Sequence, residues 1–176
     1  MQDKERVIRN CIALLEQAAT LLTRIDENLY ARKLKVSPRG SIGGHLRHCL
    51  DFYQSFLFGL DRGRIDYNDR QRDTLAERDP RHALPRIEMT IAALRSISRN
   101  DQPLSLMIST ETDGNNPPSW CSSSVMRELE FLQSHTVHHY SVIAMLLRLQ
   151  GVEPVEEFGV APSTLEHWRE RAACAR

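Results

Sequence analysis

Five of the seven histidines of this chain lie in two short groups that are more than eighty residues apart. The first group contains His45 and His48, and the second contains His135, His138 and His139. In the second group, the four-residue step from His135 to His139 places both side chains on one side of a helix, about 40° apart around its axis. Imidazole nitrogens bind divalent transition metals well, and a third histidine from another helix can complete such a site.

Burying two imidazoles side by side is unfavourable unless their nitrogens form hydrogen bonds or bind a metal. A divalent metal is one solution, and hydrogen bonds to backbone or water are the other. The presence of the other histidine group, His45 and His48, on a different helix that faces the core favours the metal. Spacing leaves the third ligand open, because His45 lies nearer the centre of the apolar arc of its helix, whereas a site at the edge between two helices suits His48 as well. His138 lies nearer the edge of its arc than His135 and His139 and is better placed beside the ligands or in solvent.

Four stretches of the chain must position these histidines, and in each of them apolar residues recur at alternating steps of three and four, as in helices that bury one face. Ser41 is a good N-cap, Asp79 and Pro80 form a helix start, and Gly151 is the glycine expected after a helix end. We therefore predict long helices over about 3–31, 41–60, 79–97 and 122–150.

The remaining segments are shorter or more polar. Residues 61–78 are predicted to form a long connection with a short helix, and residues 104–110 to form one arm of a small hairpin before the last long helix. A capping box that begins at Ser163 predicts a short final helix that carries Trp168. We expect an all-α fold, an antiparallel four-helix bundle with one long crossover, in a single domain over 1–176 that ends in an extension over 152–176.

Composition narrows the classes of function. The 23 basic and 23 acidic residues balance, which disfavours nucleic acid and anionic membranes as partners. We expect no transmembrane helix, because no apolar run reaches about 18 residues, and no signal peptide, because the N-terminus is charged. The cysteines are scattered and form no CxxC pair, which fits a reduced, cytoplasmic protein. They are Cys11, Cys49, Cys121 and Cys174.

The residues 41–48 and 132–139 together resemble the motifs of the DinB-like family (the DinB/YfiT type). The order and spacing of the helices also match, so the resemblance covers roughly residues 1–151. It implies a divalent metal (zinc, nickel, iron or manganese) held by His48, which lies seven positions after Ser41, and by His135 and His139. It also places His45 beside the ligands rather than among them.

Characterised members of this family include thiol-dependent transferases and isomerases that use mycothiol, bacillithiol or glutathione. The resemblance therefore implies a metal-dependent enzyme that acts on a small molecule, as an S-transferase with a low-molecular-weight thiol or as a hydrolase. His45 and His138 are candidates for relaying protons or orienting a ligand imidazole. Arg47 is a candidate for binding an anionic substrate or for a surface salt bridge. Members of the family often pair, and an exposed helix face permits a homodimer here.

A non-catalytic bundle is the alternative. In that case the metal pins two helices together, and the protein binds a ligand or a partner. A metal with all of its positions filled by protein favours this alternative, whereas an open site that faces a pocket favours the enzyme.

Overall fold

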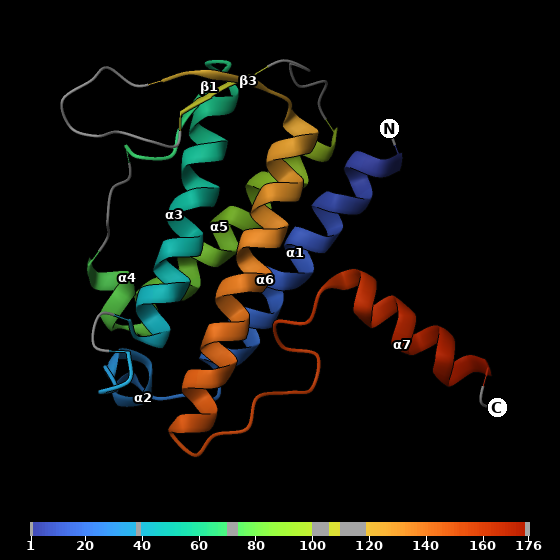
Figure 1. The fold of residues 1–176 in the computed structure, drawn as a ribbon. Coiled ribbons are helices and arrows are strands. Elements are labelled where there is room, and N and C mark those ends of the chain that lie inside the picture. The colour runs from blue at the N-terminus through green and yellow to red at the C-terminus, as the bar shows by residue number, and fades with distance from the viewer. Residues whose placement is uncertain (1, 38–39, 70–73, 100–105, 110–118, 175–176) are drawn as a thin grey trace.

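The computed structural model of the chain describes residues 2–37, 40–69, 74–99, 106–109 and 119–174 (Figure 1). Within these ranges the fold is mostly helical, as predicted, and a small sheet is added. The elements are α1 (Gln2–Leu22), α2 (Glu27–Ala31), α3 (Ile42–Leu60), β1 (Arg64–Asp66), α4 (Thr74–Arg78), α5 (Pro80–Arg99), β2 (Leu106–Ser109), β3 (Cys121–Ser123), α6 (Val125–Leu149) and α7 (Pro162–Cys174).

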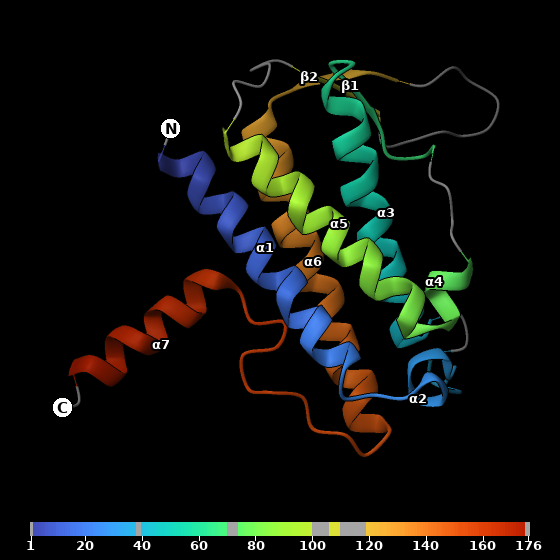
Figure 2. The same ribbon diagram turned by 180° about the vertical axis from the view of Figure 1, so that it is seen from behind.

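Four long helices pack around the core. Helix α3 lies against α5 and α6, and α1 lies against the same two helices (Figures 1 and 2). Helices α3 and α6 run in opposite directions, whereas α3 and α5 run in the same direction. The chain must therefore travel back along the molecule between α3 and α5, and β1 and α4 lie in this crossover. Large side chains that are fully buried in the core include Leu14, Leu15, Ile42, Leu46, Leu50, Tyr53, Phe56 and Tyr140.

The predicted start of α3 and the predicted end of α6 are confirmed. The Ser41 side chain accepts a hydrogen bond from the backbone N–H of Gly44 at 3.0 Å, which satisfies a donor that the first turn leaves open. At the start of α6, Ser124 accepts from the N–H of Arg127 at 3.2 Å in the same way. Gly151 follows the end of α6 with φ +80°, a conformation that glycine adopts without strain.

The single helix predicted over 3–31 is wrong. Helix α1 ends at Leu22, and a separate short helix begins at Glu27 after Asp26, whose carboxylate accepts from the N–H of Leu29 at 2.8 Å. The apolar rhythm continues across the break because Ile25 is buried and Leu29 packs against the same core. Spacing alone therefore does not reveal the break. Instead, the Asp26 cap marks it.

The predicted hairpin arm is one strand of a larger element. Strand β2 pairs antiparallel with β3 and parallel with β1, which gives a three-stranded sheet of order β1-β2-β3. The rest of the predicted arm, residues 104–105 and 110, lies outside the described residues. The polar connection does contain a short helix, α4, as predicted, but β1 was not expected, because three residues are too few to show a period. The sheet lies across the end of α3 and the beginning of α6 (Figure 1).

The final helix is present as predicted, but it begins at Pro162, one residue before the expected capping box. None of its described side chains is buried, and it extends away from the body of the molecule (Figures 1 and 2). Trp168, which it carries, is 42% exposed. Among the described helices, none is both long and apolar enough to span a membrane.

Gly43 gives a test of how closely α3 packs on its neighbours. A Cβ at this position would collide with the backbone oxygen of Glu77 and lie 2.5 Å from Cε1 of Tyr30, whereas at Gly44 the nearest atom, Oγ of Ser41, is 3.3 Å away. We expect Gly43→Ala to lower the free energy of unfolding by about 1–3 kcal/mol through overpacking. Gly44→Ala should change it by no more than about 1 kcal/mol, because alanine favours the helix. Urea unfolding of the two variants measures the difference, and equal effects would contradict the packing described.

Candidate metal centre

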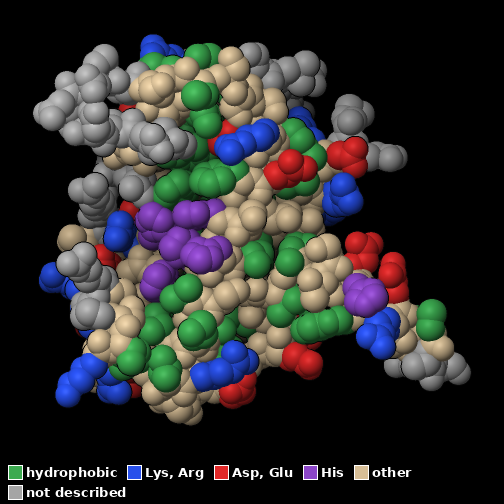
Figure 3. All heavy atoms as spheres, viewed as in Figure 1, with side chains coloured by type: hydrophobic (Ala, Val, Ile, Leu, Met, Phe, Trp, Pro, Cys, Tyr) green, Lys and Arg blue, Asp and Glu red, His purple; other side chains and the backbone are tan. Residues whose placement is uncertain are grey.

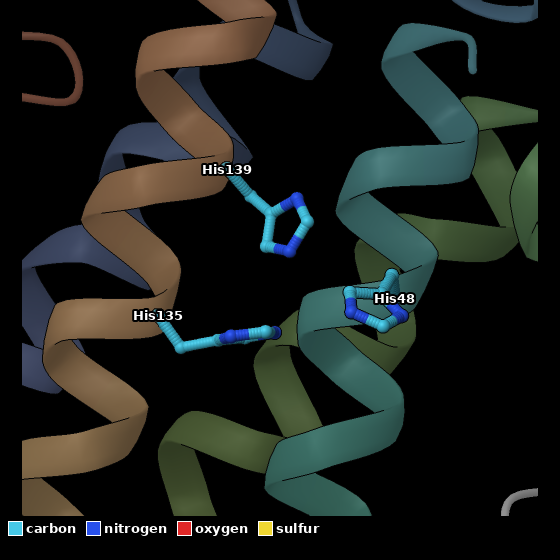
Figure 4. Close-up of side chains that lie close together, drawn as sticks. All are labelled: His48, His135 and His139. Atoms are coloured by element: carbon cyan, nitrogen blue, oxygen red, sulfur yellow. The ribbon is translucent and has the colours of Figure 1, made fainter.

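His48, His135 and His139 meet between two helices. Helix α3 supplies the first, and α6 supplies the other two, one turn apart. Each offers a nitrogen, and the three nitrogens all lie within 4.8 Å of one another. The ring centroids are 5.0 Å apart for His48 and His135, 4.6 Å for His48 and His139, and 4.5 Å for His135 and His139. Figure 4 shows the three rings pointing into the same space between α3 and α6.

The packing of α3 against α6 brings these residues together. Tyr53 of α3 and Thr136 of α6 are buried in the interface, and their hydroxyl oxygens lie 3.3 Å apart. His135 directly precedes Thr136, and His48 directly precedes the buried Cys49. Neighbouring positions on a helix point about 100° apart, so side chains next to the buried rows point along the border of the interface. The histidines therefore converge at this border.

The histidine pair lies at the surface of the helix interface and not within the core. Sequence periodicity placed His135 and His139 within the inward-facing arc, but both, like His48, are only half-buried. Thr136 and Tyr140 occupy the inward positions instead. Figure 3 shows the histidine side chains grouped on one face of the molecule, with hydrophobic side chains on both sides of the group. The site is therefore open on one side.

The three imidazoles suit a metal ion in chemistry and in spacing. Burial, followed by the proximity of His135 and His48, lowers the pKa of His139 to about 3, so this ring stays neutral and keeps a lone pair for an ion. Three nitrogens that bind one tetrahedral zinc ion at about 2.1 Å lie about 3.4 Å apart. The observed nitrogens lie within 4.8 Å of one another, so they must approach by no more than about 1.4 Å to reach that spacing. Such a donor set also suits nickel or iron.

The other two histidines of the groups lie beside this set. The Nδ1 atom of His45 is 2.9 Å from Nδ1 of His139, so His45 contacts one of the three residues and is not one of them. Burial, with a smaller effect from His138, lowers the pKa of His45. The ring of His138 lies 5.1 Å from that of His139. Of the two candidates for the third position, the structure groups His48 with the pair.

Arg47 does not point to a substrate in this structure. Its guanidinium lies 2.7 Å from Oδ2 of Asp51 and 3.3 Å from Oε2 of Glu77. The buried Asp51 also lies 3.3 Å from the guanidinium of Arg86. This network joins α3, α4 and α5, and the acids balance the charge of Arg47. Of the two roles expected for Arg47, the salt bridge is the one observed, although it is largely buried and not at the surface.

An aromatic wall made of Phe52, Tyr67 and Phe131 flanks the histidines, and the sequence analysis did not identify it. The ring of Phe52 lies 4.3 Å from that of His135 and stacks on Tyr67 at 5.1 Å, and Phe131 lies 5.4 Å from His135. The signal was available, because Phe52 follows His48 by four residues and Phe131 precedes His135 by four, which places each pair on one helix face.

A buried carboxylate anchors this wall. Glu128, in the first turn of α6, is completely buried and accepts a hydrogen bond from the Tyr67 hydroxyl at 2.7 Å. The Ser123 hydroxyl and the Arg127 guanidinium, the latter at 2.8 Å, also donate to it. A buried carboxylate is tolerated only with such partners. Through Tyr67, the aromatic wall is therefore tied to the point where β3 leads into α6.

No family model matches the chain, and no solved structure matches it. Among curated proteins it is similar to a protein named FK506-binding protein 5 from Rhizopus delemar, with 28% identity over 165 residues. The match covers 91% of this chain and 37% of the fungal protein, so the chain spans well under half the length of that relative.

Removal of any one of the three histidines should abolish tight metal binding. We expect the wild-type protein to bind about one zinc ion per chain, and His48→Ala, His135→Ala and His139→Ala to lose most of it, because two imidazoles hold an ion far more weakly than three. Isothermal titration and elemental analysis of protein purified without chelator measure this. His167→Ala, on the exposed α7, is the matched control and should bind as wild type does. Loss of binding in the control, or its retention in all three variants, would contradict the site.

The lowered pKa of His139 predicts a pH dependence for the metal-free protein. Its pKa is about 3 in the folded chain against an ordinary value of 6.5, so below about pH 6.5 the unfolded chain binds more protons than the folded one. The contribution of His139 to the free energy of unfolding is therefore fully present above about pH 6.5 and is lost as the pH falls toward 3. Urea unfolding in EDTA between pH 7.5 and 5 should show a steeper loss for wild type than for His139→Gln. Parallel curves for the two proteins would rule out this effect.

Proposed function

We propose that the chain is a metal-dependent enzyme of the DinB-like family, whose four long helices form the antiparallel bundle of that family. The observation that carries the proposal is the convergence of His48, His135 and His139, drawn from two distant segments, within 4.8 Å of one another. The directions and packing of α1, α3, α5 and α6, with a crossover between α3 and α5, are compatible with such a bundle.

The openness of the site supports an enzyme over a purely structural metal. Structural zinc sites are closed by four protein ligands, whereas catalytic sites keep a position for water or substrate. Among the described residues, the group that could hold an ion consists of three histidines and no cysteine or carboxylate. These histidines are half-buried and grouped on one face of the molecule (Figure 3). An ion held there is accessible to a small molecule from outside.

The proposed reaction forms a carbon–sulfur bond between a low-molecular-weight thiol and an electrophilic carbon, while the bond from that carbon to its leaving group breaks and the thiol proton is released. The alternative reaction is the hydrolysis of a bond by water. A divalent metal in the site supplies Lewis acidity, which makes a thiol or a water molecule more acidic. The residues of the chain hold and orient: His48, His135 and His139 bind the ion. His45 and His138 lie next to His139, where a neutral imidazole can take up a proton.

The aromatic wall favours substrates with an apolar part. Phe52 and Phe131 place apolar ring surface beside His135, and Arg127 lies 5.2 Å from the centre of the Phe131 ring. A flat or aliphatic substrate group gains free energy by covering such surface, at about 25 cal/mol per Å². We therefore expect aromatic electrophiles to react faster than small polar ones.

The remaining parts of the proposal concern the setting of the reaction. The four cysteines are free thiols, which fits a reducing, cytoplasmic environment. The proposed partner is a small-molecule substrate, and we propose a homodimer as in other members of the family.

A thiol-conjugation assay tests the proposal. We expect the zinc- or nickel-loaded protein to accelerate the reaction of glutathione, bacillithiol or mycothiol with aromatic electrophiles such as chlorodinitrobenzene or phenacyl halides. His135→Ala should reduce the rate by at least about tenfold, because one lost ligand weakens the site, while His167→Ala should leave it unchanged. In parallel, aryl ester and amide substrates without thiol test the hydrolase. Equal rates for wild type and His135→Ala in both assays would refute an enzymatic role for the site.

A further inference from the structure

A close contact within the histidine group joins His45 to His139. Their Nδ1 atoms lie 2.9 Å apart, and their ring centroids are 5.2 Å apart. Two imidazole nitrogens at this distance form a hydrogen bond in which one carries the hydrogen and the other offers its lone pair. The bond therefore links the tautomers of the two rings, since a hydrogen on one Nδ1 requires a lone pair on the other.

The position of the second nitrogen of His139 decides the direction of this bond. Nδ1 of His139 faces His45, so Nε2 is the nitrogen left for a metal ion. Figure 4 shows one nitrogen of His139 pointing toward the space between His135 and His48. A metal needs the lone pair of that nitrogen, so the hydrogen of the neutral ring must be on Nδ1. His139 then donates, and His45 accepts. The opposite arrangement places a hydrogen on Nε2, where it blocks the ion.

From this geometry we propose that His45 is a positioning residue for the metal site. Its Nδ1 accepts a hydrogen bond from Nδ1–H of His139, which selects the tautomer of His139 and aims Nε2 at the ion. Ligand histidines in proteins usually donate their second N–H to a carboxylate, a carbonyl oxygen or water. Here another imidazole takes that place. The inference rests on the proposed metal site and adds the residue that orients it.

The backbone at Gly40 holds His45 in this position. A Cβ at residue 40 would lie 2.8 Å from Nε2 of His45 and 2.9 Å from Oγ of Ser37, so a side chain at this position would displace one or both of these groups. The backbone N–H of His45 donates to the Ser41 carbonyl oxygen at 3.0 Å in the first turn of α3, which fixes the backbone that carries the ring. The ring is therefore placed between the Gly40 backbone and His139, which reduces its freedom to turn away.

The affinity for cobalt(II), an ion with a visible spectrum that reports its geometry, tests the proposal. We expect His45→Ala to weaken Co²⁺ binding by about 10- to 100-fold, as is typical when the partner of a ligand histidine is removed. His45→Asn, whose Oδ1 occupies the place of Nδ1, should restore most of the affinity and the wild-type spectrum. His167→Ala, which removes a histidine on the exposed α7 away from the site, is the control and should bind as wild type does.

Two further measurements separate the alternatives. Gly40→Ala keeps His45 but displaces its ring, so it should weaken Co²⁺ binding as His45→Ala does. In the zinc-loaded protein, ¹⁵N NMR of the histidine rings should show hydrogen on Nδ1 of His139 and metal on Nε2. Circular dichroism establishes that each variant is folded, and His45→Asn supplies the comparison if His45→Ala is not.

The outcomes are distinct. If wild type binds Co²⁺ and His45→Ala binds it within twofold, or if NMR places the metal on Nδ1 of His139, the positioning role is wrong while the metal site stands. If His45→Ala and His45→Asn are equally weak, a hydrogen-bond acceptor at this position is not what metal binding requires, and the positioning role is again wrong. If wild type binds no divalent ion, the proposed function and this inference both fail.

Discussion

The packing of α3 against α6 is the constraint on which the site depends. The buried rows of the two helices meet through Tyr53 and Thr136, whose hydroxyl oxygens lie 3.3 Å apart. This register decides that His48 lies opposite His135 and His139, because a helix that slid by one turn would move its histidine by about 5.4 Å. The packing of α3 on α6 therefore sets the geometry of the site. The residues buried in this interface position the three histidines but are not themselves part of the site.

A second set of contacts fixes the surroundings of the site. Glu128, buried at the start of α6, receives Tyr67 from the segment after β1 and Ser123 from β3. The small sheet and the long helix are thereby joined at one carboxylate. Because Tyr67 also stacks on Phe52, this anchor extends to the ring that contacts His135. Glu128 and Ser123, which do not contact the three histidines, thus help to hold the aromatic wall beside them.

The sequence predicted the parts of the molecule that obey a period or a cap. The spacing of His135 and His139, the Ser41 cap and the glycine after α6 could all be read locally, and each is present. The break after Leu22 was hidden, because Ile25 and Leu29 continue the apolar rhythm of α1 on a chain that has turned. Strand β1 is too short for a period. Which of His45 and His48 joins the pair depends on the register of two helices, which intrahelical spacing does not contain, and only the family resemblance favoured His48.

The half-buried histidines lie outside the hydrophobic core, which bears on how a metal ion would affect stability. Beneath them, Leu132, Thr136 and Tyr140 are buried in the core, so the histidines lie at its border. An ion adds stability only by mass action, in proportion to its concentration relative to its dissociation constant. Three imidazoles suit several first-row metals, so we expect the supply of ions around the protein to help decide which one binds. We therefore expect the same chain, made in media that differ in their metal content, to bind different ions.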